Sequence, residues 1–202
     1  MRIIAATGNK DKLVEFREIL GSGVEVISMS EAGADIDIEE NGKSFSENSF
    51  IKARAVYEHL LKKNMLKNSV IIADDSGLEI DALNKEPGIY SARYLGKDTS
   101  YTQKNAIILE RLKGVPMEKR TARYICAISA VFEDGSCETV EESLEGYIGC
   151  EPRGSNGFGY DPIFYVQGTN KSNAELTLEE KDRISHRGKA LRAVAAVINK
   201  AL

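Results

Sequence analysis

The strongest constraint on the fold is a short apolar run that ends in two adjacent carboxylates. Residues 70–73 (V-I-I-A) have the composition of a fully buried strand, and Asp74 and Asp75 follow directly. Ser76 and Gly77 then predict a turn. In α/β proteins, functional groups gather where strands end, so this edge is a candidate site. Because successive side chains of a strand point to opposite faces, at most one of the two carboxylates need face a given cleft.

Two carboxylates so close together are also expected to influence each other's protonation. Like charges raise one another's pKa, which favours a proton acceptor or a ligand of a hard metal ion. The simpler interpretation is that Asp74 caps a turn and Asp75 is solvated. This segment alone slightly favours the simpler interpretation, and the segments described below reverse that order.

The composition excludes several functions. The 202 residues suit one large domain or two closely joined lobes, and 42% hydrophobic with 29% charged residues is typical of a soluble globule. The 27 basic residues are spread along a chain of net charge −4, so no nucleic-acid partner is predicted and any phosphate site must be local. The N-terminal apolar stretch is too short for a signal peptide, and no run is long enough for a membrane span.

The cysteines and histidines do not predict a metal cluster or disulfides. Cys126, Cys137 and Cys150 lack C-x-x-C spacing, and only His59 and His186 accompany them, so a zinc site is not expected. Buried, reduced thiols in a cytoplasmic protein are the expectation.

A glycine-containing turn connects a predicted first strand, residues 2–6, to a predicted helix, residues 10–20. The N–H groups and the positive dipole of a helix N-terminus suit a phosphate group. Thr7 and Asn9 add side-chain donors, and Lys12 adds a positive charge. The turn is not a Walker A loop, and a strand–turn–helix with a lysine is common, so this signal is weak by itself.

Capping patterns predict three further helices, and apolar periodicity predicts a final one. The capping pairs are Ser44 with Glu47, Ser100 with Gln103, and Thr177 with Glu180. The last helix carries Leu191, Val194 and Ile198 on one face, and Ser185 can cap it. His186 and Arg187 then fall in its first turn. A lone histidine is more often structural than catalytic, whereas the neighbouring arginine is less easily explained by packing.

The predicted strands indicate an α/β fold with a mixed sheet. A second strand is expected at 24–27, and two long strands at 120–132 and 137–148 are joined by an Asp-Gly hairpin turn at 133–136. Strands alternate with helices in the first half of the chain, and the hairpin follows them.

Residues 149–161 form a glycine-rich loop with aromatic side chains. Its four glycines allow the backbone to approach a flat ligand closely, and Phe158 or Tyr160 can stack on a base. A flexible turn with two buried rings explains the same pattern equally well.

Six blocks, in order along nearly the whole chain, resemble the inosine triphosphate pyrophosphatase family. They are T-G-N-x-x-K at 7–12, E-N-G-K-S-F-S-E-N-S-F-I-K-A at 40–53, A-D-D-S-G-L at 73–78, P-G-I-Y-S-A-R-Y at 87–94, G-F-G-Y-D-P-I-F at 157–164 and K-D-R-I-S-H-R at 181–187. The resemblance implies one α/β domain over residues 1–202, with a long mixed central sheet flanked by helices and two lobes around a substrate cleft. It also implies a cytoplasmic homodimer that hydrolyses ITP, dITP and XTP to the monophosphate and pyrophosphate with Mg²⁺.

The resemblance also assigns roles to individual positions. Asp75 matches the proton acceptor and a metal ligand, and Glu40 matches a second metal ligand, with Glu39 as the alternative. The implied substrate contacts are Thr7, Gly8, Asn9, Lys10, Asp11, Lys12, Lys52, Ser76, Phe158, Gly159, Tyr160, Asp161, Lys181, His186 and Arg187. Residues 7–12 and Lys52 match phosphate contacts, residues 158–161 match a base-side loop, and the last three read the purine and its phosphates. Asn156 stands where a small residue is frequent in the family.

The residue types agree with such chemistry. Lysines, helix N-termini and a carboxylate-held Mg²⁺ neutralise the charge that develops when pyrophosphate leaves, and Asp75 can orient or deprotonate the attacking water. The lack of a Ser, Cys or His constellation argues against a covalent intermediate. Arg187 or loop N–H groups would donate to the 6-oxo group of the purine, whereas the 6-amino group of adenine would leave these donors unpaired. The alternatives are a related pyrophosphatase with another base preference, a non-catalytic nucleotide-binding sensor, or an anion-binding scaffold.

Overall fold

The computed structural model describes residues 1–20 and 23–201, which form a mixed sheet with flanking helices. The strands are β1 (Arg2–Ala5), β2 (Glu25–Ser28), β3 (Ser69–Ile80), β4 (Thr121–Val131), β5 (Cys137–Ile148) and β6 (Phe164–Val166). The helices are α1 (Lys10–Leu20), α2 (Phe45–Lys62), α3 (Tyr101–Arg111), α4 (Leu178–Ile184) and α5 (His186–Ala201). The strand order is β2-β1-β3-β4-β5-β6. Because β1 pairs in parallel with β2 and β3 while β5 and β6 are antiparallel, the predicted α/β fold with a mixed sheet is confirmed.

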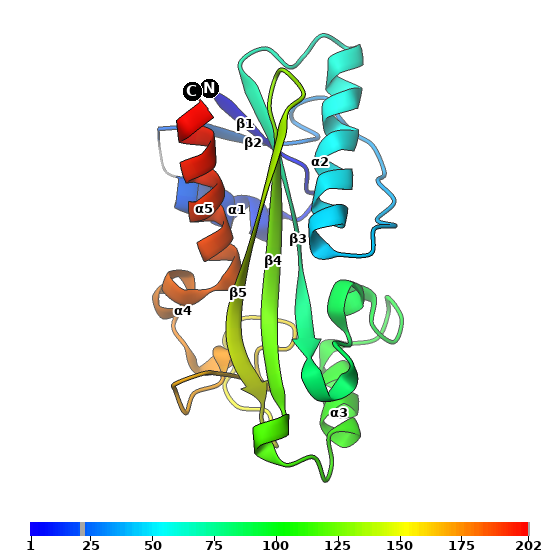
Figure 1. Cartoon of the computed structure of the whole chain (residues 1–202), viewed down its shortest axis with the longest axis vertical. Coiled ribbons are helices and arrows are strands. Elements are labelled where there is room, and N and C mark those ends of the chain that lie inside the picture. Colours follow the sequence, from blue (N-terminus) through cyan, green and yellow to red (C-terminus); the bar gives the residue numbers. More distant parts are fainter. Residues whose placement is uncertain (21–22, 202) are drawn as a thin grey trace. The chain divides into compact units, whose positions relative to one another are not determined.

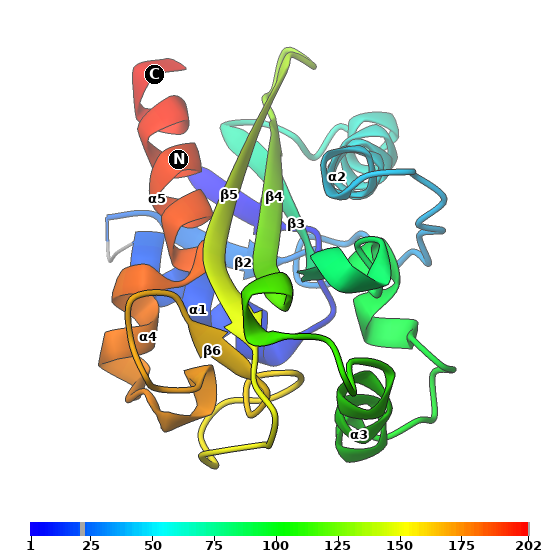
Figure 2. The same cartoon turned by 60° about the horizontal axis from the view of Figure 1, so that its bottom comes forward.

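The chain divides into two compact units. Unit 1 comprises residues 1–75, 126–142 and 187–202, and unit 2 comprises residues 76–125 and 143–186. Strands β3, β4 and β5 each contribute residues to both units. In unit 1, α1 and α5 lie on one side of the strands and α2 lies on the other (Figure 1). In unit 2, α3 lies on one side of the strands and α4 on the other, and β6 extends the sheet beside β5 (Figure 2).

Alternation along β3 builds the core of unit 1. Val70 and Ile72 belong to a buried cluster with apolar residues of α1 and α5. Ile71 and Ala73 belong to a second buried cluster, with apolar residues of α2. Within unit 1, the even-numbered side chains of this strand therefore face α1 and α5, and the odd-numbered ones face α2.

The predicted turn at Ser76 and Gly77 is wrong, because β3 continues to Ile80. Leu78 and Ile80 are fully buried in the core of unit 2, where they pack with residues of α3 and β6. Burial of these alternating apolar side chains outweighs the local turn preference of the Ser-Gly pair. The two carboxylates therefore lie inside a twelve-residue strand and not at its end.

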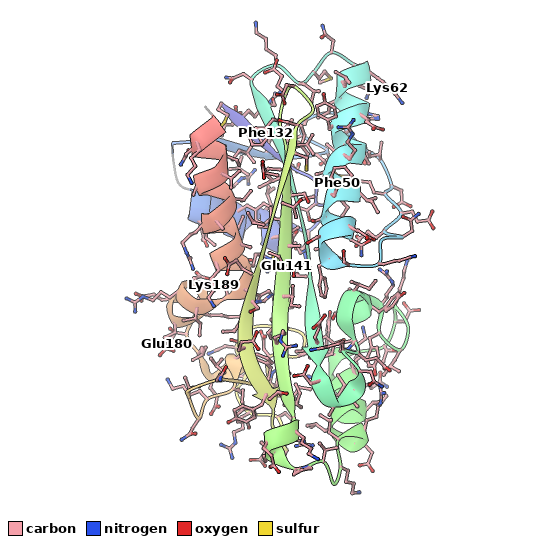
Figure 3. The ribbon with its side chains drawn as sticks, viewed as in Figure 1. Phe50, Lys62, Phe132, Glu141, Glu180 and Lys189 are labelled. Atoms are coloured by element: carbon pink, nitrogen blue, oxygen red, sulfur yellow. The ribbon has the colours of Figure 1, made fainter. Side chains whose placement is uncertain are left out.

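The hairpin and the capped helices are confirmed. Strands β4 and β5 are neighbours, and their turn is closed by the N–H of Phe132, which donates to the carbonyl of Ser136. Figure 3 labels Phe132 where β4 reaches this turn. Ser100 with Gln103 and Thr177 with Glu180 form the capping boxes of α3 and α4.

The cysteines occupy three different environments. Among the described residues all three thiols are free, and Cys126 is buried as expected. The expectation of burial is wrong for Cys150, which is exposed, and holds only in part for Cys137. Within the described ranges, no helix is both long and apolar enough to cross a membrane.

Candidate functional site

Asp74 is the centre of a buried ion-pair cluster in unit 1. As an even-numbered residue of β3 it faces α1 and α5, and its side chain is only 1% exposed. Its carboxylate accepts from the Lys12 Nζ at 2.8 Å and from the Arg187 Nε at 3.3 Å. The Arg187 Nη1 also donates to Glu15 at 2.8 Å, so the cluster joins β3 to both helices.

These cations determine the protonation state of Asp74. Burial raises the pKa of this carboxyl, but the charges of Lys12, Arg187 and Lys52 together lower it by a larger amount. The pKa of Asp74 therefore lies well below the usual range. Asp74 is therefore a permanent anion near neutral pH. The expectation that both adjacent carboxyls have raised pKa values is wrong for this one.

Asp75 faces the opposite side of β3 and contacts α2. Its Oδ2 accepts from the Asn48 Nδ2 at 3.0 Å, and its Oδ1 lies 3.6 Å from the Lys52 Nζ. The same ammonium lies 3.3 Å from the Glu40 Oε1. Two carboxylates from separate segments thus converge on one lysine. Glu39 is exposed, and it is Glu40 that contacts Lys52.

The pKa of Asp75 is raised, in contrast to that of its neighbour. Burial is the largest cause, and the negative charge of Glu40 adds to it. Lys52 and the hydrogen bond from Asn48 partly oppose the shift. Among like charges, the largest contribution to this shift in pKa therefore comes from Glu40 and not from the adjacent Asp74. A carboxylate with a raised pKa is a better proton acceptor than an ordinary aspartate.

The turn before α1 is organised by its own side chains. The Thr7 Oγ1 accepts from the N–H of Asn9 at 3.1 Å, and the Asn9 Oδ1 accepts from the N–H of Lys12 at 3.3 Å. A Cβ atom at Gly8 would meet no atom within 4 Å, so this turn is open on that side. The side chains of Lys10 and Asp11 lie outside the described part of the structure. The turn thus leads directly into the N-terminus of α1, as the sequence predicts, and such a terminus suits a phosphate group.

In unit 2, Asp161 organises the glycine-rich loop. Its Oδ2 accepts from the Lys181 Nζ at 2.6 Å and from the N–H of Phe158 at 3.1 Å. Its Oδ1 accepts from the Tyr124 hydroxyl at 3.0 Å and from the Asn173 Nδ2 at 2.7 Å. Four donors therefore hold one buried carboxylate and fix the loop around it.

The two rings of this loop have different environments. Phe158 is 65% exposed, and the Lys181 Nζ lies 5.3 Å from the centre of its ring. Tyr160 is buried, and its hydroxyl donates to the carbonyl of Ser91 at 2.7 Å. Of the two rings considered for stacking, only Phe158 is presented to solvent. Gly157 has φ +78°, and a Cβ there would lie 2.3 Å from the Asp161 Oδ2, so the loop requires glycine at this position.

His186 and Arg187 are neighbours in sequence but contact different groups. The ring of His186 stacks on Tyr124 in unit 2, with the ring centres 4.9 Å apart. Arg187 binds Asp74 and Glu15 in unit 1. Unit 1 therefore holds the predicted residues 7–12, Glu40, Lys52, Asp74, Asp75 and Arg187, and unit 2 holds Ser76, Phe158, Gly159, Tyr160, Asp161, Lys181 and His186.

Sequence reasoning missed several residues that fix these clusters. Asn48, Glu15, Tyr124 and Asn173 each contact a predicted site residue. Only Asn48 lies in one of the six sequence blocks, four positions before Lys52 and therefore on the same helical face. That spacing is a signal from which its role can be inferred, and the other three residues carry no comparable signal.

Glu40 and Asp75 fit a magnesium ion. Among the residues the structure describes, no group of three or more His, Cys, Asp or Glu side chains is placed to hold a metal. Mg²⁺ does not need such a group, because it is commonly held by one or two carboxylates, with waters and substrate phosphate oxygens completing its octahedron. Glu40 and Asp75 converge on one cation, Lys52, and so form a carboxylate pair of this kind.

The fold and these clusters define an α/β protein with two lysine–carboxylate groups on opposite faces of one strand. The sequence profile of the Ham1 family matches residues 3–197, and the chain belongs to this family. The resemblance drawn from the six blocks is thereby confirmed.

Relatives and solved structures are similar to this chain over nearly its full length. The dITP/XTP pyrophosphatase of Bacillus subtilis is 45% identical over 196 residues, which are 96% of each chain, and that of Exiguobacterium sibiricum is 42% identical over 98% of this chain and 97% of its own. The Ham1 protein of Staphylococcus aureus superposes with a TM-score of 0.89 at 38% identity, covering 100% of both chains.

We expect the Asp74 cluster to make the free energy of unfolding decrease as the pH falls. Because the pKa of Asp74 is lower in the folded state, the unfolded chain binds more protons and acidification favours unfolding. The stabilisation is complete above the unfolded pKa of about 4 and is lost as the pH falls below it. Asp74→Asn removes the carboxylate shared by Lys12 and Arg187 and should cost on the order of 3 kcal/mol near neutral pH, since Arg187 keeps Glu15 as a partner.

Urea unfolding of both proteins between about pH 7 and about pH 3 measures this difference. The gap in unfolding free energy between wild type and Asp74→Asn should narrow as the pH falls. Asp98→Asn, at an exposed carboxylate, is the control and should show no such gap. A gap that keeps its full size in acid would contradict the assignment.

Proposed function

We propose that this protein hydrolyses the non-canonical purine nucleoside triphosphates ITP, dITP and XTP to the monophosphate and pyrophosphate, with Mg²⁺. The observation that carries the proposal is the carboxylate of Asp75, which has a raised pKa and shares the ammonium of Lys52 with Glu40. Membership of the Ham1 family and relatives named dITP/XTP pyrophosphatase over their full length support the substrate class.

In this proposal, the residues of unit 1 act on the triphosphate. Asp75 orients a water molecule towards the α-phosphorus and accepts a proton from it, while the bond from that phosphorus to the bridging oxygen breaks and pyrophosphate leaves. The start of α1, Lys12 and Lys52 supply the positive field that stabilises the developing negative charge. Asp74 acts indirectly by holding Lys12 in place.

Glu40 and Asp75 are the residues that would hold Mg²⁺. When bound there, the ion neutralises charge on the phosphate oxygens and lowers the pKa of coordinated water. Glu40 is preferred over Glu39 in this role because it contacts the same ammonium as Asp75.

The glycine-rich loop of unit 2 is assigned to the base. The exposed ring of Phe158 offers a stacking surface, and the Lys181 Nζ beside it offers a donor for a 6-oxo group. A 6-amino group would place a second donor against that ammonium, which discriminates against adenine. Arg187 is assigned to the phosphate-binding unit, because its guanidinium binds Asp74 and Glu15.

The wider setting is proposed on the family resemblance. We propose that residues 1–202 act as one functional domain of two lobes, and that the protein works in the cytoplasm as a homodimer. Light scattering of the purified protein tests the dimer, because a mass equal to that of a single 22.2 kDa chain would contradict it.

Product analysis with ITP, dITP, XTP, GTP and ATP tests the activity and the substrate class together. We expect pyrophosphate and the monophosphate from ITP, dITP and XTP, much less from GTP and ATP, and no turnover after chelation of Mg²⁺. Release of orthophosphate alone, or equal rates on ATP and ITP, would contradict the proposal. Binding of ITP without any product would favour a non-catalytic sensor.

Asp75→Asn tests the role of the proton acceptor. The amide cannot accept the proton, so kcat on the best substrate should fall by about 10²- to 10⁴-fold, whereas nucleotide affinity should change much less. Asp37→Asn removes an exposed carboxylate of the loop before α2 and should leave kcat unchanged. Turnover by Asp75→Asn at the wild-type rate would show that another group accepts the proton.

A further inference from the structure

Asn48 is a fully buried amide that connects the two segments carrying Asp75 and Glu40. Its Nδ2 donates to the Asp75 Oδ2 at 3.0 Å. Its Oδ1 accepts from the N–H of Gly42 at 2.8 Å, two residues after Glu40. The amide nitrogen therefore contacts β3, and the amide oxygen contacts the loop before α2.

Gly42 allows the loop to approach this amide. A Cβ atom at Gly42 would lie 2.7 Å from the Asn48 Oδ1 and 2.8 Å from the Glu47 Cβ. Any side chain at this position would therefore push the loop away from the start of α2. The glycine is required here by lack of space, since its φ is not in the left-handed region.

Helix α2 presents two donors to Asp75 from the same face. Asn48 and Lys52 are four residues apart, so their side chains lie one above the other along the helix. Asn48 contacts the Oδ2 of Asp75, while the Lys52 Nζ lies near its Oδ1. Lys52 also contacts Glu40, so the two residues fix the Asp75 side chain and the Glu40 loop together.

The start of this helix is itself fixed in position. Ser44 is the N-cap and its side chain accepts from the N–H of Glu47, while the Glu47 Oε2 accepts from the N–H of Lys43 at 2.7 Å. The first turn of α2 is thus a firm base for Asn48. Figure 3 shows Phe50 and Lys62 farther along this helix.

We propose that Asn48 is the positioning residue that holds the carboxylates of Asp75 and Glu40 in register with each other. The proposal rests on the proposed function, in which these two carboxylates hold Mg²⁺ and Asp75 accepts a proton. A donor and an acceptor at one position are both required. Alanine leaves the Asp75 Oδ2 and the Gly42 N–H without this partner, and an aspartate would direct an acceptor at Asp75.

Asn48→Ala and Ser49→Ala form a matched pair for the kinetic test. Ser49 is also fully buried on α2. Its hydroxyl contacts the Ser129 hydroxyl at 2.8 Å and the carbonyl of Ser46 at 2.9 Å, and these partners are neither Asp75 nor Glu40. We expect Asn48→Ala to lower kcat by about 10- to 100-fold. KM should stay within about threefold, because an orientation effect acts on the transition state. Ser49→Ala should retain the wild-type kcat.

A second readout does not depend on turnover. Titration of each protein with Mn²⁺ alone, followed by the electron paramagnetic resonance signal of the free ion, measures metal affinity directly. Asn48→Ala should weaken Mn²⁺ binding by about 10-fold or more, and Ser49→Ala should not weaken it. Gly42→Ala displaces the same amide oxygen and should reproduce both effects if Asn48→Ala fails to fold.

The outcomes separate the two proposals. A wild-type protein that hydrolyses none of the nucleotides would refute the proposed function, and the Mn²⁺ titration would still decide the role of Asn48. Equal kcat and equal Mn²⁺ affinity in Asn48→Ala and Ser49→Ala would overturn the positioning role. A wild-type protein that neither turns over nor binds Mn²⁺ would remove the site and this proposal with it.

Discussion

The site depends on the alternation of side chains along β3. Asp74 and Asp75 are adjacent in a strand, so they point to opposite faces and meet different helices. Asp74 contacts Lys12 of α1 and Arg187 of α5, whereas Asp75 contacts Asn48 and Lys52 of α2. A shift of the strand by one residue would turn each carboxylate to the opposite face and away from its present partners.

The two environments give two aspartates different pKa values and therefore different chemical roles. Asp74 is buried against two cations, and the resulting low pKa makes it a structural anion that fixes Lys12. Asp75 is buried beside Glu40 with one shared lysine, and its raised pKa suits it for proton transfer. The division of roles therefore follows from neighbours supplied by other elements, and each element arrives there because its apolar face packs on β3.

Much of the fold could be predicted from local patterns, and the errors have identifiable physical causes. Capping pairs and the Asp-Gly hairpin depend on residues close in sequence, so their predictions were confirmed. The turn at Ser76 and Gly77 was wrong because burial of Leu78 and Ile80 decides the strand's length. The grouping of Arg187, the burial of Tyr160 and the contacts of Asn48 depend on partners distant in the chain, which no local pattern specifies.

Site-resolved titration of the two adjacent carboxyls by ¹³C nuclear magnetic resonance tests the opposite-face arrangement most directly. The arrangement predicts that the pKa of Asp74 lies below the usual aspartate range and the pKa of Asp75 above it. The upward shift in the pKa of Asp75 should also be smaller in Glu40→Gln, since the charge of Glu40 contributes to that shift. Shifts of both carboxyls in the same direction, or in the reverse order, would contradict the two-faced site.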